Sequence, residues 1–364
     1  MNNIGKTFVF KSNGEVFRIP ALYYKENEKK LFGFTEKQTS RHDSSAVALV
    51  MSTGTVDTDE LTQKKTMKCP CGYRPMNPCT VYEKDTQTLF LFFNHVRLHY
   101  ITKKNDDKWS EFTDLTDLLP TDNWSVGPGH GIQTESGRMI VPAYAYMKEN
   151  NIPHSFYIYS DDKGSTWHYG AMLDKTSGEC EMDEVSDITG DSLIYCNACN
   201  KGGFRVQAEI DESFHTFKSN TLLKELDKGC QGSVISFPAQ PEDAETSQKK
   251  CLLFSHPTNQ KIAWQRLDLG VYLSSSPVNS NGNCSGEWSQ PWVINQRHSD
   301  GWFACLMECG EKSATDEIAC QVFSYEEVLR GIQGAIMKSE NKYKRINLHG
   351  KTFQTIINKE AGLE

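Results

Sequence analysis

The 364-residue chain has no run that approaches 18 consecutive apolar residues, so the sequence predicts no membrane-spanning helix. Residues 1–16 also lack the apolar run of a secretory signal, and we expect a cytoplasmic protein whose 12 cysteines are reduced thiols. Positive charge is not in excess, because the net charge is −8 at pH 7. This balance argues against a nucleic-acid partner, and an anionic small ligand would need a local cluster of arginines.

The cysteines form no clear metal-binding pattern. Cys196 and Cys199 make one CxxC segment, and Cys69 and Cys71 make a close pair. Residue order permits a zinc site, which would need two such pairs at a suitable spacing, but we favour buried structural cysteines. We therefore predict no metal site and no cofactor.

Amphipathic helical periodicity is scarce, whereas short strand-like runs recur along the whole chain. Examples are residues 88–93, 138–146, 204–210 and 251–255, which are rich in β-branched and aromatic residues and are bounded by Gly, Pro, Asn and Asp. This pattern is typical of an all-β protein.

One tight-turn signature stands out among these runs. Residues Ser160–Trp167 fit S-x-D-x-G-x-T-W, and fainter copies end at Trp109, Phe217 and Trp288. Successive copies lie about 50 to 70 residues apart, which matches one four-stranded blade per repeat and predicts a β-propeller. We expect residues 1–334 to form a single propeller domain and residues 335–364 to form a polar tail, for which contact with a membrane surface or a partner stays open.

Eight segments spread over most of the chain carry a family resemblance. They are FRIPALYY (17–24), RPMNPCTVY (74–82), SVGPGHGIQ (125–133), VPAYAY (141–146), the Ser160–Trp167 box, RVQAE (205–209), GCQGSVISFP (229–238) and WQRLDLGVYL (264–273). With these segments the chain resembles the vertebrate cytosolic or ganglioside-type sialidases. The resemblance implies a six-bladed β-propeller that removes terminal sialic acid from glycans.

Sialic acid carries a carboxylate on its anomeric carbon. Arginine guanidinium groups bind a carboxylate as planar forks, and each charge-assisted contact is worth roughly 1.5–3 kcal/mol. A carboxylate nucleophile would be repelled by the substrate, and sialidases use a tyrosine instead. The resemblance implies that Arg18, Arg205 and Arg266 form the arginine triad that holds this carboxylate.

The resemblance also assigns the remaining site residues. Asp43 matches the acid/base aspartate, and Glu184, in the segment 183–185, matches the glutamate that pairs with the nucleophile. Tyr144 and Tyr146 lie two residues apart and would share one face of a strand. The positions that match pocket-lining residues of the family are Glu36, Gln38, Asn77, Tyr144, Tyr146 and Gln231.

The chain departs from the family pattern around its last blade. His298 stands where the family has its nucleophilic tyrosine, and only Gly301 and Trp302 separate Asp300 from the next strand, so this blade is shortened. Imidazole could attack the anomeric carbon or deprotonate a water molecule. A tyrosine from elsewhere in the chain, such as Tyr272 or Tyr325, remains an alternative.

Two other departures concern the pocket. Gln38 occupies a position that is usually an arginine, and the loop after Phe93 is short and lacks a family glutamate. The leading hypothesis is an exo-α-sialidase that acts on gangliosides, glycoproteins or oligosaccharides. The alternatives are a sialic-acid-binding propeller with weak or no turnover, and a scaffold without a glycan role. Peripheral membrane contact and the oligomeric state stay open.

Overall fold

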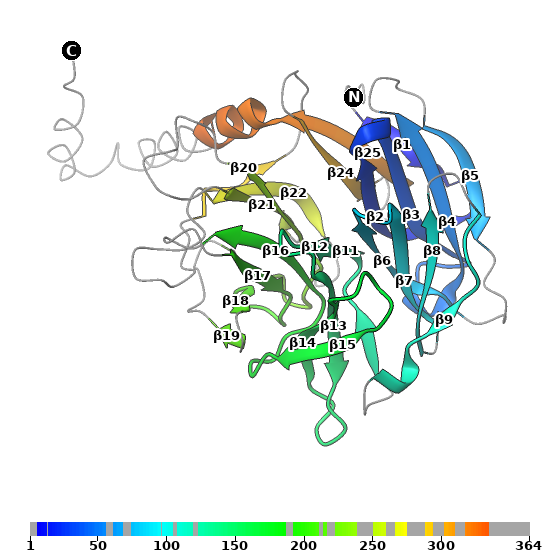
Figure 1. Cartoon of the computed structure of the whole chain (residues 1–364). Helices are drawn as coiled ribbons and strands as arrows, with labels where there is room; N and C mark the ends of the chain where they lie inside the picture. The colour runs from blue at the N-terminus through cyan, green and yellow to red at the C-terminus, as the bar shows by residue number, and fades with distance from the viewer. Residues whose placement is uncertain are drawn as a thin grey trace, which may run out of the picture.

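The protein is described here by a computed structural model. The residues that the structure describes are 6–12, 14–55, 61–67, 74–95, 97–104, 108–118, 123–186, 192–210, 214–216, 223–238, 250–259, 266–274, 288–293, 302–309 and 317–334. Strands dominate these residues (Figure 1), which confirms the all-β prediction. The predicted tail at 335–364 lies outside the described residues.

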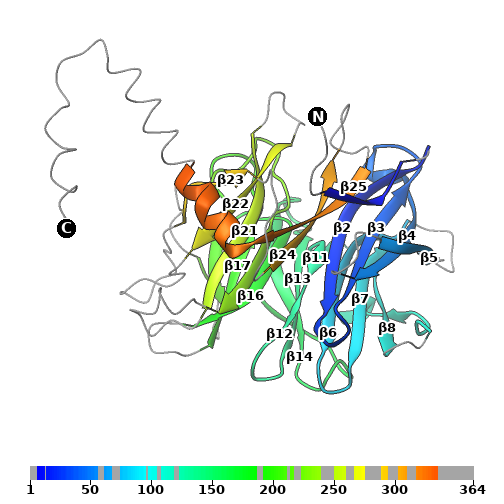
Figure 2. The same cartoon turned by 90° about the horizontal axis from the view of Figure 1, so that it is seen from above.

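The strands form six sheets that follow one another along the chain and surround a common centre, as the blades of a propeller do (Figures 1 and 2). Blade 1 contains β2 (Val16–Lys25), β3 (Lys30–Gln38), β4 (Ala46–Thr55) and β5 (Leu61–Met67). Blade 2 contains β6 (Met76–Glu83), β7 (Thr88–His95), β8 (Arg97–Lys104) and β9 (Thr113–Asp114), with β11 (Gly129–His130) parallel to β6.

The next three blades repeat this layout. Blade 3 contains β10 (Trp124–Val126), β12 (Ile132–Gln133), β13 (Met139–Tyr146), β14 (Pro153–Ser160) and β15 (His168–Met172). Blade 4 contains β16 (Cys180–Ser186), β17 (Ser192–Ala198), β18 (Val206–Ile210) and β19 (Phe214–Thr216). Blade 5 contains β20 (Ser233–Pro238), β21 (Lys250–Asn259), β22 (Leu267–Ser274) and β23 (Trp292–Val293).

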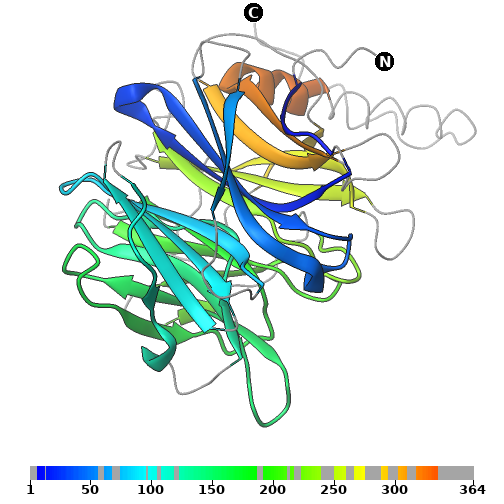
Figure 3. The same ribbon diagram turned by 90° about the vertical axis from the view of Figure 1, so that its right-hand side faces the viewer.

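Blade 6 joins the two ends of the described chain. Its sheet has the order β1–β25–β24, with β1 (Lys6–Phe10), β25 (Glu317–Ser324) and β24 (Trp302–Cys309). Figure 3 shows β1, in dark blue, beside the orange strands of this blade. The pairing of β1 with β25 closes the ring, because the first strand completes the last blade.

Short helices contribute little to the fold. Three 3₁₀ turns connect strands, namely η1 (Glu26–Glu28), η2 (Asp43–Ser45) and η3 (Thr116–Leu118), and a helix over 325–334 follows β25. Within the described residues, no helix is both long and apolar enough to cross a membrane.

The Ser160–Trp167 box fastens blade 3 to blade 2. Asp162 accepts hydrogen bonds from the Thr166 amide (2.8 Å) and hydroxyl (2.6 Å), while Trp167 packs edge-on against Phe92 with ring centroids 4.9 Å apart. Gly164 has φ +85°, and a Cβ there would lie 2.4 Å from the Phe90 ring, so glycine is required on two counts. The box is therefore a structural staple.

The hydrophobic core lies between neighbouring blades. Phe90, Val141 and Trp167 belong to one cluster shared by blades 2 and 3, and Met182 and Ile140 belong to another shared by blades 3 and 4. Side chains alternate across each strand, so both faces of a blade are buried against its neighbours. The inner ends of the strands are thereby held in place around the central channel.

Candidate functional site

The inner strands β2, β6, β16 and β20 begin at one face of the propeller, and the predicted site residues collect there. We call this face the site end. Arg18 lies near the start of β2 and is buried. Its Nε lies 3.3 Å from Oε1 of Glu308, which also accepts a hydrogen bond of 3.0 Å from the Ile19 amide. One carboxylate of blade 6 thus fixes the backbone and the guanidinium of blade 1.

The backbone is distorted at this point. Ile19 has φ +57°, which is unfavourable for a β-branched residue, and the register of β2 with β3 shifts between Arg18 and Ala21. Asn77 has φ +52° at the equivalent place in blade 2, where the register shifts between Met76 and Cys79. Bulges at the starts of two inner strands redirect side chains that would otherwise follow the regular alternation.

The loop that carries Asp43 lies against Arg18. The Arg18 Nη1 donates to the Arg41 carbonyl at 3.5 Å, and η2 begins two residues later at Asp43. The amide of Thr39 donates to the Ser45 carbonyl at 3.0 Å and closes the loop. The Asp43 side chain lies outside the described residues, so its role stays a prediction.

Arg205 is fully buried at the site end of blade 4. Its Nε donates to Asn197 Oδ1 and its Nη1 donates to Glu225 Oε2, both at 2.7 Å, while the guanidinium lies 5.3 Å from the Phe254 ring centroid. The Nη2 has no hydrogen-bond partner among the described residues. This buried donor is one of the few polar groups without a partner in the described part of the chain, whereas nearly all buried polar groups in proteins have one.

Glu225 is the counter-ion of Arg205. It is fully buried and also meets His256 Nε2 at 3.1 Å. Burial raises the pKa of Glu225, but the Arg205 charge and the His256 hydrogen bond outweigh it and lower that pKa to about 2. The ionised carboxylate therefore keeps the guanidinium in a single position.

Arg205 and Arg266 meet at adjacent carbonyl groups. Arg205 Nη1 donates to the Cys230 carbonyl, and Arg266 Nη2 donates to the Gly229 carbonyl at 3.4 Å. Burial raises the pKa of the Cys230 thiol to about 12, while the charges of Arg266 and Arg205 lower it. Both guanidinium groups therefore lie close to this thiol. Two arginines of the predicted triad are thus neighbours.

Arg18 and Arg266 line one central cavity of about 1950 Å³. Arg205 does not line this cavity, but Cys230, which accepts its hydrogen bond, does. The structure therefore brings two of the three arginines to a common cavity and places the third directly behind its wall.

Four predicted pocket residues form one hydrogen-bond chain across blades 1 to 3. Glu36 is fully buried, and its carboxylate accepts from the Asn77 amide (2.8 Å) and from Gln38 Nε2 (2.8 Å). The Asn77 side chain donates in turn to Ser125 Oγ (2.9 Å) and to the Tyr144 hydroxyl (3.4 Å). Gln38 thus serves as a neutral donor to Glu36 at the position where an arginine was expected.

Tyr144 and Tyr146 lie on the same face of β13, with ring centroids 6.1 Å apart at 69°, as the sequence predicts. Burial raises the pKa of both hydroxyls, and the charge of Glu179 raises them further. Both phenols therefore stay protonated at neutral pH and can donate hydrogen bonds.

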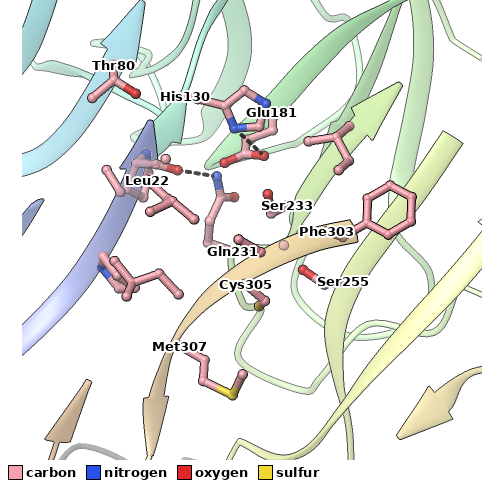
Figure 4. A pocket seen from close by; sticks show the side chains of 18 of the residues that line it. Leu22, Thr80, His130, Glu181, Gln231, Ser233, Ser255, Phe303, Cys305 and Met307 are labelled. Atoms are coloured by element: carbon pink, nitrogen blue, oxygen red, sulfur yellow. Dashed lines mark hydrogen bonds and ion pairs between the residues drawn. The ribbon is translucent and has the colours of Figure 1, made fainter. Parts of the chain in front are cut away.

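Gln231 crosses the floor of the cavity (Figure 4). Its Nε2 donates to the Pro128 carbonyl at 2.9 Å and to the Cys180 carbonyl at 3.3 Å. The residue that was predicted to contact substrate thereby joins blades 3, 4 and 5 at the site end.

Glu184 lies in the second half of β16 (Cys180–Ser186). Its carboxylate accepts hydrogen bonds from the Glu135 amide and from Ser192 Oγ, and it lies 2.9 Å from Lys250 Nζ. It follows Cys180 by four residues along β16, which is roughly 13 Å at 3.3 Å per residue. Glu184 nevertheless lines the same cavity as Arg18 and Arg266, and its pairing with the nucleophile stays a prediction.

Glu179 is another carboxylate that lines this cavity, and the sequence did not single it out. It immediately precedes β16 at the site end and lines the cavity together with Cys230 and Gln231. Its charge acts on Tyr144 and on Cys230, and Arg205 and Arg266 act on Cys230 too. This carboxylate was missed because the sequence pattern alone did not establish which residue begins β16.

His298 lies outside the described residues. Of the alternative tyrosines, Tyr272 is buried and packs against Phe254 with centroids 5.9 Å apart, and Tyr325 packs against Phe237. Burial raises the pKa of Tyr272 to about 12. Both alternatives therefore sit in hydrophobic packing.

The zinc alternative finds no support in the described part of the chain. There, no group of three or more His, Cys, Asp or Glu side chains could hold a metal ion. Cys196 is buried, and Cys69 and Cys71 lie outside the described residues.

Comparisons with known proteins complete the description. Residues 31–336 match the family model described as a BNR repeat-like domain. The chain is 34% identical to Sialidase-3 of Mus musculus over 398 residues, covering 88% of this chain and 93% of that protein. It is 33% identical to Sialidase-2 of Cricetulus griseus over 384 residues, covering 91% and 98%.

Solved structures show the same fold. An intramolecular trans-sialidase from Ruminococcus gnavus, in complex with oseltamivir carboxylate, has a TM-score of 0.67 at 15% identity and covers 90% of this chain and 98% of that chain. The Trypanosoma rangeli sialidase in complex with sialic acid has a TM-score of 0.64 at 15% identity and covers 95% of this chain and 60% of that chain.

Proposed function

The chain belongs to the sialidase family, and we propose that it is an exo-α-sialidase that removes terminal sialic acid from gangliosides, glycoproteins or oligosaccharides. The observation that carries the proposal is the meeting of Arg18 and Arg266 on one cavity, with Arg205 fixed behind its wall. Three guanidinium groups near one acidic sugar would bind its carboxylate as charge-assisted forks.

Preorganisation supports this role. Glu308 holds Arg18, and Glu225 with Asn197 holds Arg205, so the donors are positioned before the ligand arrives. The enzyme then has little side-chain entropy to lose when the carboxylate binds. The Tyr144 and Asn77 network would face the N-acyl and glycerol groups, because it offers neutral donors rather than charges.

The leaving group needs a proton. Asp43 would donate it to the glycosidic oxygen as the bond from that oxygen to the anomeric carbon breaks, and the aglycone would leave as an alcohol. The Asp43 loop lies against Arg18, so acid and carboxylate clamp would act on the same sugar.

The attacking group would be His298 or a water molecule that His298 deprotonates. Attack by the imidazole would form a covalent intermediate, which water then hydrolyses while Asp43 takes back a proton, and the product would retain its configuration. Direct attack by water would invert it. We assign the supporting carboxylate to Glu179 because it adjoins the arginine group.

Cleavage of a fluorogenic α-sialoside tests the proposal. We expect wild-type turnover, and we expect Arg266→Ala to raise KM at least about ten-fold because one charge-assisted pair is worth roughly 1.5–3 kcal/mol. Arg330→Ala is a matched control, since this exposed arginine on the helix over 325–334 bonds only within its own helix among the contacts described. Normal KM in Arg266→Ala would contradict the clamp.

One observation favours a second candidate, a sialic-acid-binding propeller with weak or no turnover. Blade 6, next to the position of His298, has three strands among the described residues, where blades 1, 4 and 5 have four. Saturable binding of the 2,3-unsaturated sialic acid analogue without any cleavage would support this candidate. Cleavage that disappears in Asp43→Ala would exclude it.

The finer expectations remain predictions of the same proposal. These are the preference for gangliosides over other sialylated glycans, peripheral contact with membranes and a cytoplasmic location. Cell fractionation together with release assays on ganglioside vesicles and on soluble sialyl-oligosaccharides would separate them.

A further inference from the structure

Two carboxylates of β16, the buried Glu181 and the partly buried Asp183, hold the backbone of β20. Oε2 of Glu181 accepts the Val234 amide at 3.0 Å, and Oδ2 of Asp183 accepts the Ser236 amide at 2.5 Å. The Ser236 hydroxyl also donates to Asp183 Oδ1 at 3.1 Å. Since β16 and β20 belong to different sheets, these side chains supply the acceptors that a strand ladder would otherwise give.

His130 provides the opposite charge. Its Nδ1 lies 3.4 Å from Oε2 of Glu181, and Figure 4 shows the two side chains facing each other above Gln231. Burial lowers the pKa of His130, but the charges of Glu181 and Asp183 outweigh it and raise that pKa to about 9. At neutral pH the imidazole is therefore protonated and acts as a counter-ion, not as a base.

The strand that these groups hold continues from the segment that contacts the arginines. The Gly229 carbonyl accepts Arg266, the Cys230 carbonyl accepts Arg205, and Gln231 is fastened to Pro128 and Cys180. Three residues lie between Cys230 and Val234. A shift of Val234 would therefore be transmitted along a short, tightly bonded segment to both arginines.

We propose that Glu181, with His130 as its counter-ion and Asp183 beside it, is a positioning residue that fixes the segment 229–236 and thereby sets Arg205 and Arg266 for the substrate carboxylate. The inference rests on the proposed function, because that function supplies the substrate carboxylate that these arginines would bind. Glu181 itself touches neither arginine, so its influence passes through backbone. It acts as a second layer behind the clamp, of the kind that orients ligand-binding groups elsewhere.

The ionisable groups around His130 come from two elements. Glu181 and Asp183 face it from β16, and Cys79 of β6 feels the charge of Glu181. Burial keeps the Cys79 thiol neutral by raising its pKa. A group with a raised pKa stabilises the fold fully below its ordinary value and loses this contribution as pH rises through the shifted one. We therefore expect substrate affinity to fall above about pH 9.

The test uses Glu181→Gln, which keeps an oxygen for Val234 but removes the charge that His130 needs. We expect KM to rise about ten-fold, kcat to change less, and affinity for the unsaturated sialic acid analogue to fall in parallel. In NMR of ¹⁵N-histidine-labelled protein, the pKa of His130 should drop from about 9 toward its ordinary value. Asp183→Asn should show the same changes to a smaller degree, and it serves as the second variant if Glu181→Gln does not fold.

Glu83→Gln is the control. Glu83 is also a buried carboxylate on an inner strand, but it accepts from Thr86 and Gln133 and not from the segment 229–236. The Glu83→Gln variant should have a lower Tm, as Glu181→Gln does, but its KM should stay unchanged. A Glu181→Gln enzyme with wild-type KM, ligand affinity and His130 pKa would overturn the proposal. If wild-type protein neither cleaves nor binds sialosides, the proposed function fails, and the His130 titration alone then decides whether the carboxylate–imidazole pair exists.

Discussion

Blade 4 and blade 6 face the same cavity, but they differ in the strand and in the charged side chains that they place there. In blade 4 the inner strand β16 begins at the site end, and a full set of charged partners surrounds it. In blade 6 the innermost described strand is β24, which reaches the site end with its last residues, where Glu308 meets Arg18. β24 therefore runs toward the site end, as β3 does. β3 is the second strand of blade 1, and its Glu36 also lies near the end of the strand.

The contrast indicates where the family pattern is kept and where it is altered. Blade 4 supplies Arg205 and Glu179 in an arrangement fixed by several bonds each. In blade 6 the strand that would correspond to β2 or β16 is absent from the described residues, and there the sequence replaces the family tyrosine by His298. In the proposed function, blades 1, 4 and 5 supply the sugar-binding arginines, and the nucleophile comes from the segment around His298.

The largest expected effect distinguishes Glu179 from Glu184, which are two of the carboxylates of blade 4. Glu179→Gln should lower kcat by about 10²–10⁴, the usual contribution of a group that assists proton transfer, whereas Glu184→Gln should change it less than about ten-fold. Steady-state kinetics on an α-sialoside measures both. If Glu184→Gln proved the more damaging, the placement of the working carboxylate at the site end would be wrong.

The next effect concerns the stability of blade 4. Arg205→Ala leaves Glu225 as a buried charge with His256 as its remaining side-chain partner, and it should cost about 3–5 kcal/mol of unfolding free energy. Arg138→Ala is the control, because its pair with Asp161 is exposed and such pairs are worth about 0–1 kcal/mol. Urea unfolding measures the loss of unfolding free energy in both variants. Equal losses in the two variants would contradict the buried network.

Glu225 also predicts how stability depends on pH. Its pKa of about 2 lies below the ordinary 4.5, so its contribution is complete above pH 4.5 and is lost as pH falls toward 2. The shift corresponds to about 3 kcal/mol. The difference in unfolding free energy between wild type and Glu225→Gln should therefore shrink over this range, and a constant difference would be inconsistent with an ionised Glu225.

The smallest expected effect is a change in kcat at His298, the residue predicted to stand at the nucleophile position. His298→Tyr restores the family nucleophile and should raise kcat, by up to about ten-fold if the rest of the tyrosine machinery is in place. NMR of the first-formed product shows whether configuration is retained. Lower activity in the variant would indicate that the altered blade no longer presents this position to the anomeric carbon.

The sequence predicted the parts that local patterns determine. The strand pattern and the Ser160–Trp167 box predicted the propeller, and the family resemblance around Arg18 and Arg266 pointed to residues that line one cavity, while the clamp itself stays a prediction. The sequence did not single out Glu179, because the letters of a strand do not reveal how far each residue lies from the site end. A one-residue change of register would also alter which face carries a side chain.

Other residues were missed because their partners are distant in sequence. Glu225 pairs with both Arg205 and His256, and Glu308 meets Arg18 only because the ring closes. Glu181 and Asp183 did leave a signal, since acids two apart on a strand share one face, but their acceptor role depends on the neighbouring blade.

A structure with the 2,3-unsaturated sialic acid analogue bound tests the central claim most directly. We predict that its carboxylate contacts Arg18 and Arg266 in front of the wall that holds Arg205, and that Glu179 lies beside the anomeric carbon. A ligand bound away from Arg18 and Arg266, or a carboxylate that contacts no guanidinium, would contradict the account.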